Sequence, residues 1–207
     1  MAQSVVDVCN SALQKLGAAS ITNILDNSRE ARACNLAYDS NRRSEFRKHY
    51  WNFAMKRQIL APDSVAPAFE YAYAFTLPTD CLRIVLPNDA YLDWYLEGRK
   101  ILTNLASSPF GNSGNFTVSA SSAPSAASLN LKYIADVTDA SLWDPTFYDM
   151  LAISLAIDMC ETLTQSNKKK EDLNAEYRAT SIEARLADAF ESLPQDPPDD
   201  SWILVRL

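Results

Sequence analysis

Residues 49–60, HYWNFAMKRQIL, mark the point at which the sequence changes from one kind of pattern to another. Before this stretch, apolar residues recur at intervals of three and four, which is typical of amphipathic helices. After it, large and small residues alternate, which is typical of strands. The stretch contains His49, the only histidine of the chain, and the large aromatic residues Trp51 and Phe53. We therefore predict that it joins a helical part to a β part.

The N-terminal part is predicted to begin with two helices. Ser4 and Asp7 have the spacing of a capping box, so we predict that a helix occupies residues 4–16. Gly17 follows directly and is suited to the left-handed conformation that ends many helices. A second, longer helix is predicted over residues 28–50, with apolar residues along one side.

A β part is predicted over residues 59–135. Gly98 lies between two alternating segments and favours a hairpin turn, because glycine adopts positive φ easily. Residues 105–128 are rich in Ser, Gly, Asn and Ala, which is typical of a loop or of a hairpin with a long tip. One strand is predicted to place four alternating aromatic residues on a single face: Phe69, Tyr71, Tyr73 and Phe75.

The C-terminal part returns to helical patterns. Asp144 followed by Pro145 predicts the start of a broadly apolar helix, which we expect at the centre of a bundle. A more polar helix is predicted over residues 166–190. The prolines of LPQDPPDD cannot continue this helix, and the apolar segment SWILVRL, residues 201–207, comes after them.

Together these patterns predict an α+β fold. Residues 1–58 and 136–193 are expected to form one four-helix bundle-like domain, because no single helix has enough apolar surface to stand alone. Residues 59–135 are expected to form a small antiparallel β domain inserted between these two parts. Residues 194–207 are expected to form an extended C-terminal interaction tail.

The composition argues against several classes of protein. The 207 residues include 26 acidic and 19 basic side chains, a net charge of −7, whereas general nucleic-acid binders usually carry a basic excess. No segment approaches the roughly 18 apolar residues of a membrane span, and the N-terminus lacks the features of a secretory signal, so we predict synthesis in the cytoplasm and no membrane partner. Buried reduced thiols, rather than a metal site, are predicted for the four dispersed cysteines: Cys9, Cys34, Cys81 and Cys160.

No catalytic or cofactor-binding motif stands out. His49 has no nucleophile motif to accompany it, so it is more typical of a helix end than of a catalytic triad. The four glycines are too dispersed for a phosphate-binding loop. We therefore predict no cofactor and no enzymatic activity. The alternative is a hydrolase that uses a carboxylate pair, for which the candidates are four acids that otherwise read as turn and cap residues: Asp136, Asp139, Asp144 and Asp149.

Basic residues are concentrated around the end of the helix predicted over residues 28–50. Cations are favoured near a helix C-terminus, but four of them within residues 42–48 exceed what this effect requires. Three interpretations stay open: a solvated helix surface, a contact with an acidic partner surface, and a nucleic-acid contact. The partner-binding residues predicted here are Arg42, Arg43, Arg47 and Lys48, with Lys56 and Arg57 just beyond them.

The C-terminal segment is the second candidate for a partner contact. An exposed apolar segment is a liability unless it docks on a surface. It could fold back onto its own domain, or reach a neighbouring subunit or another partner. The residues that we predict to make this contact follow the acidic, proline-rich spacer: Trp202, Ile203, Leu204, Val205 and Arg206.

Several of these segments occur in an order that is known from one family. FRKHYWNFAMKRQIL is followed by YAYAFTLPTDCLR, then by YIADVTDASLWDPTF, and finally by DSWILVRL. This series resembles the tail tubular protein A family, the head-to-tail adaptors of short-tailed bacteriophages, and the resemblance extends over nearly the whole chain. One departure is Tyr50, which stands where the family pattern leads us to expect proline. None of the matching segments is a catalytic motif, so the resemblance points to assembly rather than to chemistry.

The resemblance implies a structural protein of the virion tail that is made in the host cytoplasm. It implies a ring of about twelve subunits that docks beneath the portal protein, carries the tail nozzle protein, and continues the channel for DNA ejection. DNA is expected to pass through without specific binding, which the negative net charge suits. Trp51 and Phe53 are expected to plug the joint between the basic helix and the β insert, with Asn52 bonded to exposed backbone there. The alternatives are a virion-associated cell-wall hydrolase and a nucleic-acid-binding module.

Overall fold

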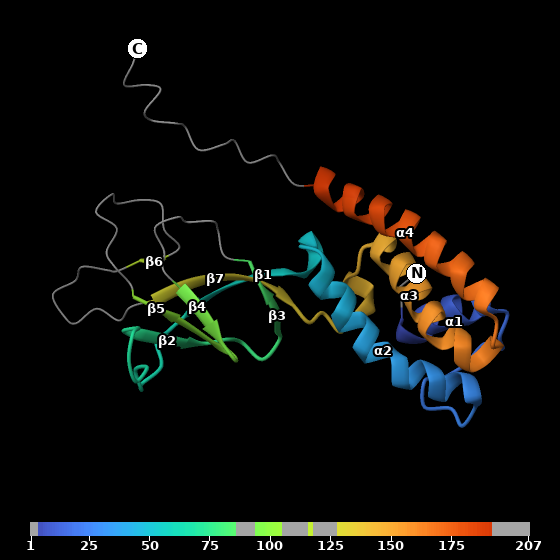
Figure 1. The fold of residues 1–207 in the computed structure, drawn as a ribbon, viewed down its shortest axis with the longest axis horizontal. Helices are drawn as coiled ribbons and strands as arrows, with labels where there is room; N and C mark the ends of the chain where they lie inside the picture. The colour runs from blue at the N-terminus through green and yellow to red at the C-terminus, as the bar shows by residue number, and fades with distance from the viewer. Residues whose placement is uncertain (1–3, 86–93, 105–115, 118–127, 192–207) are drawn as a thin grey trace, which may run out of the picture.

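The computed structural model describes residues 4–85, 94–104, 116–117 and 128–191. These residues form an α+β fold in which the four helices occupy one end and the strands the other (Figure 1). The predicted tail, residues 194–207, and most of the loop predicted over residues 105–128 lie outside the described residues.

The first helix follows the capping chemistry that the sequence predicts. Helix α1 spans Val5–Leu16, and the side chain of Ser4 accepts a hydrogen bond from the backbone N–H of Asp7 while Asp7 bonds back to Ser4. Gly17 ends the helix with φ 73°, a left-handed conformation that costs glycine little. Helix α2 spans Arg29–Lys48 and begins at the cap residue Ser28, so it ends two residues before the predicted boundary.

The third helix lies at the centre of the helical end. Helix α3 spans Pro145–Thr164, with Asp144 as its N-cap, and contacts α1, α2 and α4. It is buried on most sides, which explains why its apolar residues do not follow one narrow stripe. Helix α4 spans Asn167–Phe190, begins at the cap residue Ser166, and buries only a thin stripe against α3 (Figure 1).

The strands form two antiparallel sheets. The larger sheet has strand β7, Ser128–Ala135, between β1, Met55–Leu60, and β3, Cys81–Ile84, and the short strand β6, Phe116–Thr117, also pairs with β7. The smaller sheet has β5, Lys100–Thr103, between β2, Tyr73–Thr76, and β4, Trp94–Glu97. The hairpin predicted around Gly98 is confirmed: Glu97 pairs with Lys100, and Gly98 has φ 56°.

One predicted domain boundary and one predicted strand differ from the bounds of the observed strands. Strand β1 begins at Met55, so the boundary predicted between residues 58 and 59 falls inside a strand. Four of its six residues are exposed, which leaves little alternation to detect. Strand β2 covers only the second half of the predicted aromatic strand. Phe69 lies before it and is 80% exposed, and Glu70, with φ 72°, interrupts the extended backbone.

Two hydrophobic cores meet along strand β7. Side chains alternate across a strand, and Leu129, Leu131 and Tyr133 belong to a core shared by the two sheets. Ile134 points the other way and belongs to the core of the helical end. The four cysteines are free and buried, as predicted. No helix within the described part of the chain is both long and apolar enough to cross a membrane.

Candidate functional site

The basic residues of α2 are not all exposed to solvent. Arg42 is only 2% exposed and forms an ion pair with Asp136, which follows β7. Arg43 is exposed, and its Nε lies 3.1 Å from a carboxylate oxygen of the same Asp136. The prediction that Arg42 makes a solvent-facing partner contact is therefore wrong. Its guanidinium is buried because it pairs with Asp136, which lies far along the chain.

Lys48 is bound into a polar network around Glu45. The Glu45 side chain is 1% exposed, and its oxygens accept hydrogen bonds from Lys48 at 2.7 Å and from Tyr177 at 2.8 Å. Ser154 donates a third bond at 2.8 Å. Burial acts to lower the pKa of Lys48, but the hydrogen bonds to Glu45 and Tyr177 outweigh it and the pKa is raised. Lys48 therefore neutralises a buried acid within the bundle.

The aromatic residues of the opening stretch lie between the end of α2 and the start of α3. Trp51 is 1% exposed, and its indole N–H donates to the backbone carbonyl of Glu45 at 3.1 Å. The Trp51 and Phe147 ring centroids are 5.1 Å apart and edge to face, and Phe53 lies 5.3 Å from Phe147. Such arrangements are the favourable ones for aromatic rings.

Asp188 connects the segment after α2, which contains His49 and Asn52, to helix α4. The side-chain amide of Asn52 donates to the Asp188 carbonyl at 2.7 Å, and the Asn52 backbone N–H donates to the Asp188 carboxylate at 2.8 Å. His49 Nε2 lies 3.0 Å from the other carboxylate oxygen. Asn52 thus bonds backbone, as predicted from the sequence, but its partner is a helix far along the chain that no local pattern indicates.

We expect Asp188→Ala to lower the free energy of unfolding by about 1.5–3 kcal/mol, because hydrogen bonds to a charged and largely buried group are lost. Urea denaturation followed by circular dichroism measures this. The control is Asp172→Ala, an exposed acid on the same helix, which should change stability by less than about 0.5 kcal/mol. Equal losses for the two variants would show that Asp188 does not fasten the joint.

A hollow of about 260 Å³ opens where the end of α2 meets β3 and the β4–β5 hairpin. Its walls are partly apolar, with Ile84, Trp94 and Leu96 among them. Three arginines also line it, and we call it the three-arginine pocket: Arg47, Arg83 and Arg99. No aspartate or glutamate is among its lining residues in the part of the chain that the structure describes. Arg47 is the only one of the sequence-predicted basic residues that it contains.

Each of the three arginines is held in place by a backbone carbonyl. Arg47 donates to Leu82, Arg99 donates to Pro78, and Arg83 donates to the carbonyl of Arg47 at 2.9 Å. Among the described ion pairs, none gives these guanidiniums a carboxylate partner. Burial raises the pKa of the neighbouring Cys81 thiol, although Arg99 and Arg47 act in the opposite direction. In the described part of the chain, the pocket therefore brings three arginines together with no carboxylate in its lining.

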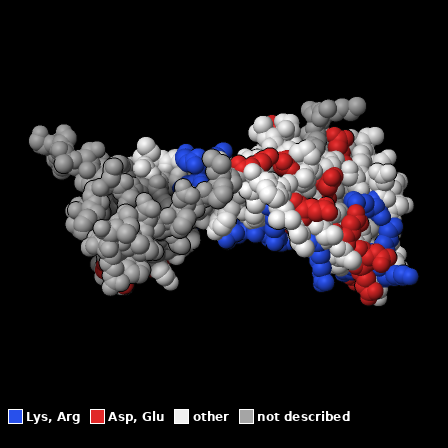
Figure 2. Space-filling model, turned by 90° about the horizontal axis from the view of Figure 1, so that it is seen from above, with Lys and Arg blue, Asp and Glu red and all other residues white. Residues whose placement is uncertain are grey.

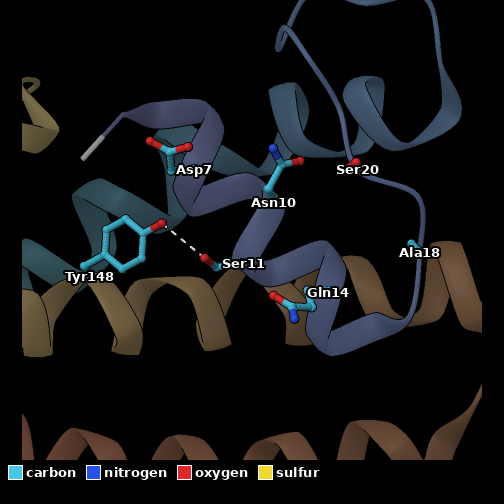
Figure 3. Close-up of a pocket in the computed structure, with 7 residues that line it drawn as sticks. All are labelled: Asp7, Asn10, Ser11, Gln14, Ala18, Ser20 and Tyr148. Atoms are coloured by element: carbon cyan, nitrogen blue, oxygen red, sulfur yellow. Dashed lines mark hydrogen bonds between the residues drawn. The ribbon is translucent and has the colours of Figure 1, made fainter. Parts of the chain in front are cut away.

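A larger hollow of about 440 Å³ lies beside α1 and the start of α3 (Figure 3). Four of its six polar lining residues already have hydrogen-bond partners in the structure. Ser11 and Tyr148 share a hydrogen bond of 3.1 Å, Asn10 bonds both backbone groups of Ile21, and Asp7 belongs to the capping box. These bonds stabilise α1 and the segment that connects α1 to α2.

The acids considered for carboxylate chemistry have structural partners in three of four cases. Asp136 pairs with arginines, Asp139 caps a short 3-10 helix, Ala140–Leu142, and Asp144 caps α3. Asp149 is exposed. Among the described residues, no group of three or more His, Cys, Asp or Glu side chains is placed to hold a metal ion.

Two exposed apolar surfaces were not found by sequence reasoning. On α4, Ile182, Leu186 and Phe190 are 59%, 53% and 87% exposed and recur every four residues, which places them on one face. On β4, at the edge of the smaller sheet, Trp94, Tyr95 and Leu96 are all exposed. On the face shown in Figure 2, acidic and basic side chains are interspersed over the helical end. The predicted tail contacts, Trp202 to Arg206, lie outside the described residues.

A scan against protein-family models and a search of curated proteins find no match for this chain.

Proposed function

We propose that this chain is a structural virion protein, a head-to-tail adaptor that connects the portal to the tail nozzle and continues the DNA channel. The proposal is supported by the resemblance of its segments to the tail tubular protein A family. The structural observation that carries it is the pair of exposed apolar surfaces, one on the C-terminal half of α4 and one on β4 of the smaller sheet. A connector needs at least two such surfaces, because it contacts more than one neighbour.

The chemistry of the two surfaces suits protein partners. Exposed groups of large apolar side chains mark interaction sites on soluble proteins, and tryptophan and tyrosine are enriched where binding energy is concentrated. We assign the α4 surface to the portal and the β4 surface to the nozzle or to neighbouring subunits of the ring. Each surface is smaller than the roughly 800 Å² per partner of a stable interface, so each contact also includes surrounding residues.

We expect the triple variant Ile182→Ser, Leu186→Ser and Phe190→Ser to weaken portal binding by at least about tenfold, because buried apolar anchors dominate interfaces. Stability should change by less than about 1.5 kcal/mol, since all three side chains are exposed. Co-sedimentation with the portal ring of the same phage measures binding. The control is Leu36→Ser, a single leucine of α2 that is 86% exposed. Unchanged binding by the triple variant would remove α4 from the portal contact.

A further inference from the structure

We propose that the three-arginine pocket binds residues 199–207 of the same chain. The pocket offers three guanidiniums and an apolar wall, and the segment DDSWILVRL offers Asp199 and Asp200 directly before Trp202. Arginine and carboxylate form the strongest of the common charge-assisted hydrogen bonds, often in pairs. An aromatic or aliphatic side chain next to the acids would cover the exposed faces of Trp94 and Leu96.

The charge of the pocket argues for an acidic occupant. Positive charges that lie close together repel one another, and in folded proteins a nearby carboxylate usually offsets this repulsion. The chain as a whole has a net charge of −7, yet the described lining of this hollow contains three arginines and no acidic residue. The guanidiniums are also oriented in advance by the carbonyls of Leu82, Arg47 and Pro78, so binding an anion costs little further ordering.

The end of α4 lies close enough for its own continuation to reach the pocket. Asp188 bonds to His49 and Asn52, and Arg47 precedes His49 by two residues on α2. The eight residues that follow Glu191, Ser192 to Asp199, include three prolines and span up to about 25 Å when extended. A helix is about 10–12 Å wide, so this length suffices to pass around the end of α2.

The size of the pocket favours a tethered occupant over a separate protein. A hollow of about 260 Å³ accepts a few side chains, which is far less than the surface that a stable complex between separate proteins buries. A short tether raises the local concentration of the segment to the millimolar range, where such a small contact is populated. The inference concerns the isolated chain and does not rest on the proposed function. A partner that binds the β4 surface would have to displace the segment from Trp94 and Leu96.

The test places a nitroxide label on the full-length chain through Ser201→Cys and records the backbone amide signals by NMR. We expect the label to abolish the signals of residues 96–99 and of Arg47 and Arg83, while those of α1 persist. The wild-type chain, whose cysteines are all buried, receives the same reagent and gives the background. Full signals at the pocket, or losses confined to the α4 surface instead, would overturn the inference.

Charge variants show whether the arginines hold the segment. Arg99→Glu, or Asp199→Asn together with Asp200→Asn on the segment, should restore the lost signals, and Arg57→Glu should not. Arg57 is the matched control because it is an exposed arginine of β1 outside the pocket. Persistent losses in both of the first two variants would contradict the proposed contact.

Mixing separates an intramolecular contact from one between copies. Nitroxide-labelled chain without isotope is added to ¹⁵N-labelled chain without nitroxide. We expect the amide signals of the three-arginine pocket to stay intact in this mixture. Their loss would show that the segment binds a second copy, and this would overturn the assignment to the same chain.

Discussion

Replacing Trp51 with alanine is expected to lower the free energy of unfolding by about 3–5 kcal/mol, the usual cost of removing a large aromatic side chain from a core. The Trp51 side chain is 1% exposed and packs against Phe53 and Phe147, so its removal leaves a cavity between α2 and α3. It also removes the donor to the Glu45 carbonyl near the end of α2. Chemical denaturation followed by far-ultraviolet circular dichroism measures the loss.

Trp94→Ala provides the matched control for Trp51→Ala. Trp94 is 37% exposed on strand β4, so the same substitution there should cost much less. If both variants lost the same stability, or if Trp51→Ala lost less than about 1 kcal/mol, Trp51 would not be the plug of the joint.

Replacing Asp136 with alanine is expected to lower the free energy of unfolding by about 3–5 kcal/mol, because it leaves the buried guanidinium of Arg42 without its buried counter-charge. Arg42 is 2% exposed and relies on Asp136 as its buried counter-charge. The pair joins α2 to the chain that follows β7, so its loss should loosen the contact between the two ends of the molecule. Thermal and urea unfolding of the variant measure the effect.

Asp39 allows a direct comparison, because it also pairs with Arg42, at 3.3 Å. Its side chain is 72% exposed, and an exposed ion pair contributes about 1 kcal/mol or less. We therefore expect Asp39→Ala to be at least about threefold less destabilising than Asp136→Ala. Similar losses would mean that burial does not determine the strength of this network.

The helix ends could be predicted from the sequence because their chemistry is local. Ser4 with Asp7, and Asp144 with Pro145, each satisfy backbone groups within a few residues, so the spacing alone identifies them. The turn at Gly98 is local in the same sense. The order of helices, strands and helices followed from these boundaries and from the change of period after the opening stretch.

The site could be predicted only in part, because its partners are distant in the chain. The sequence does not distinguish the buried Arg42 from its exposed neighbour Arg43, because their partner Asp136 lies far along the chain. Asp188 carries no local signal, although it fastens both His49 and Asn52. The α4 surface was missed for another reason. Its apolar residues run beside the thin buried stripe, and periodicity alone does not say which of two adjacent stripes faces the core.

The adaptor proposal is tested most directly by the solution mass of the protein, measured by light scattering alone and after mixing with the portal protein of the same phage. The proposal predicts that the chain joins the portal in a fixed, ring-like ratio, whether it is a monomer or a ring beforehand. A chain that stays separate from the portal at every ratio would contradict the proposed function.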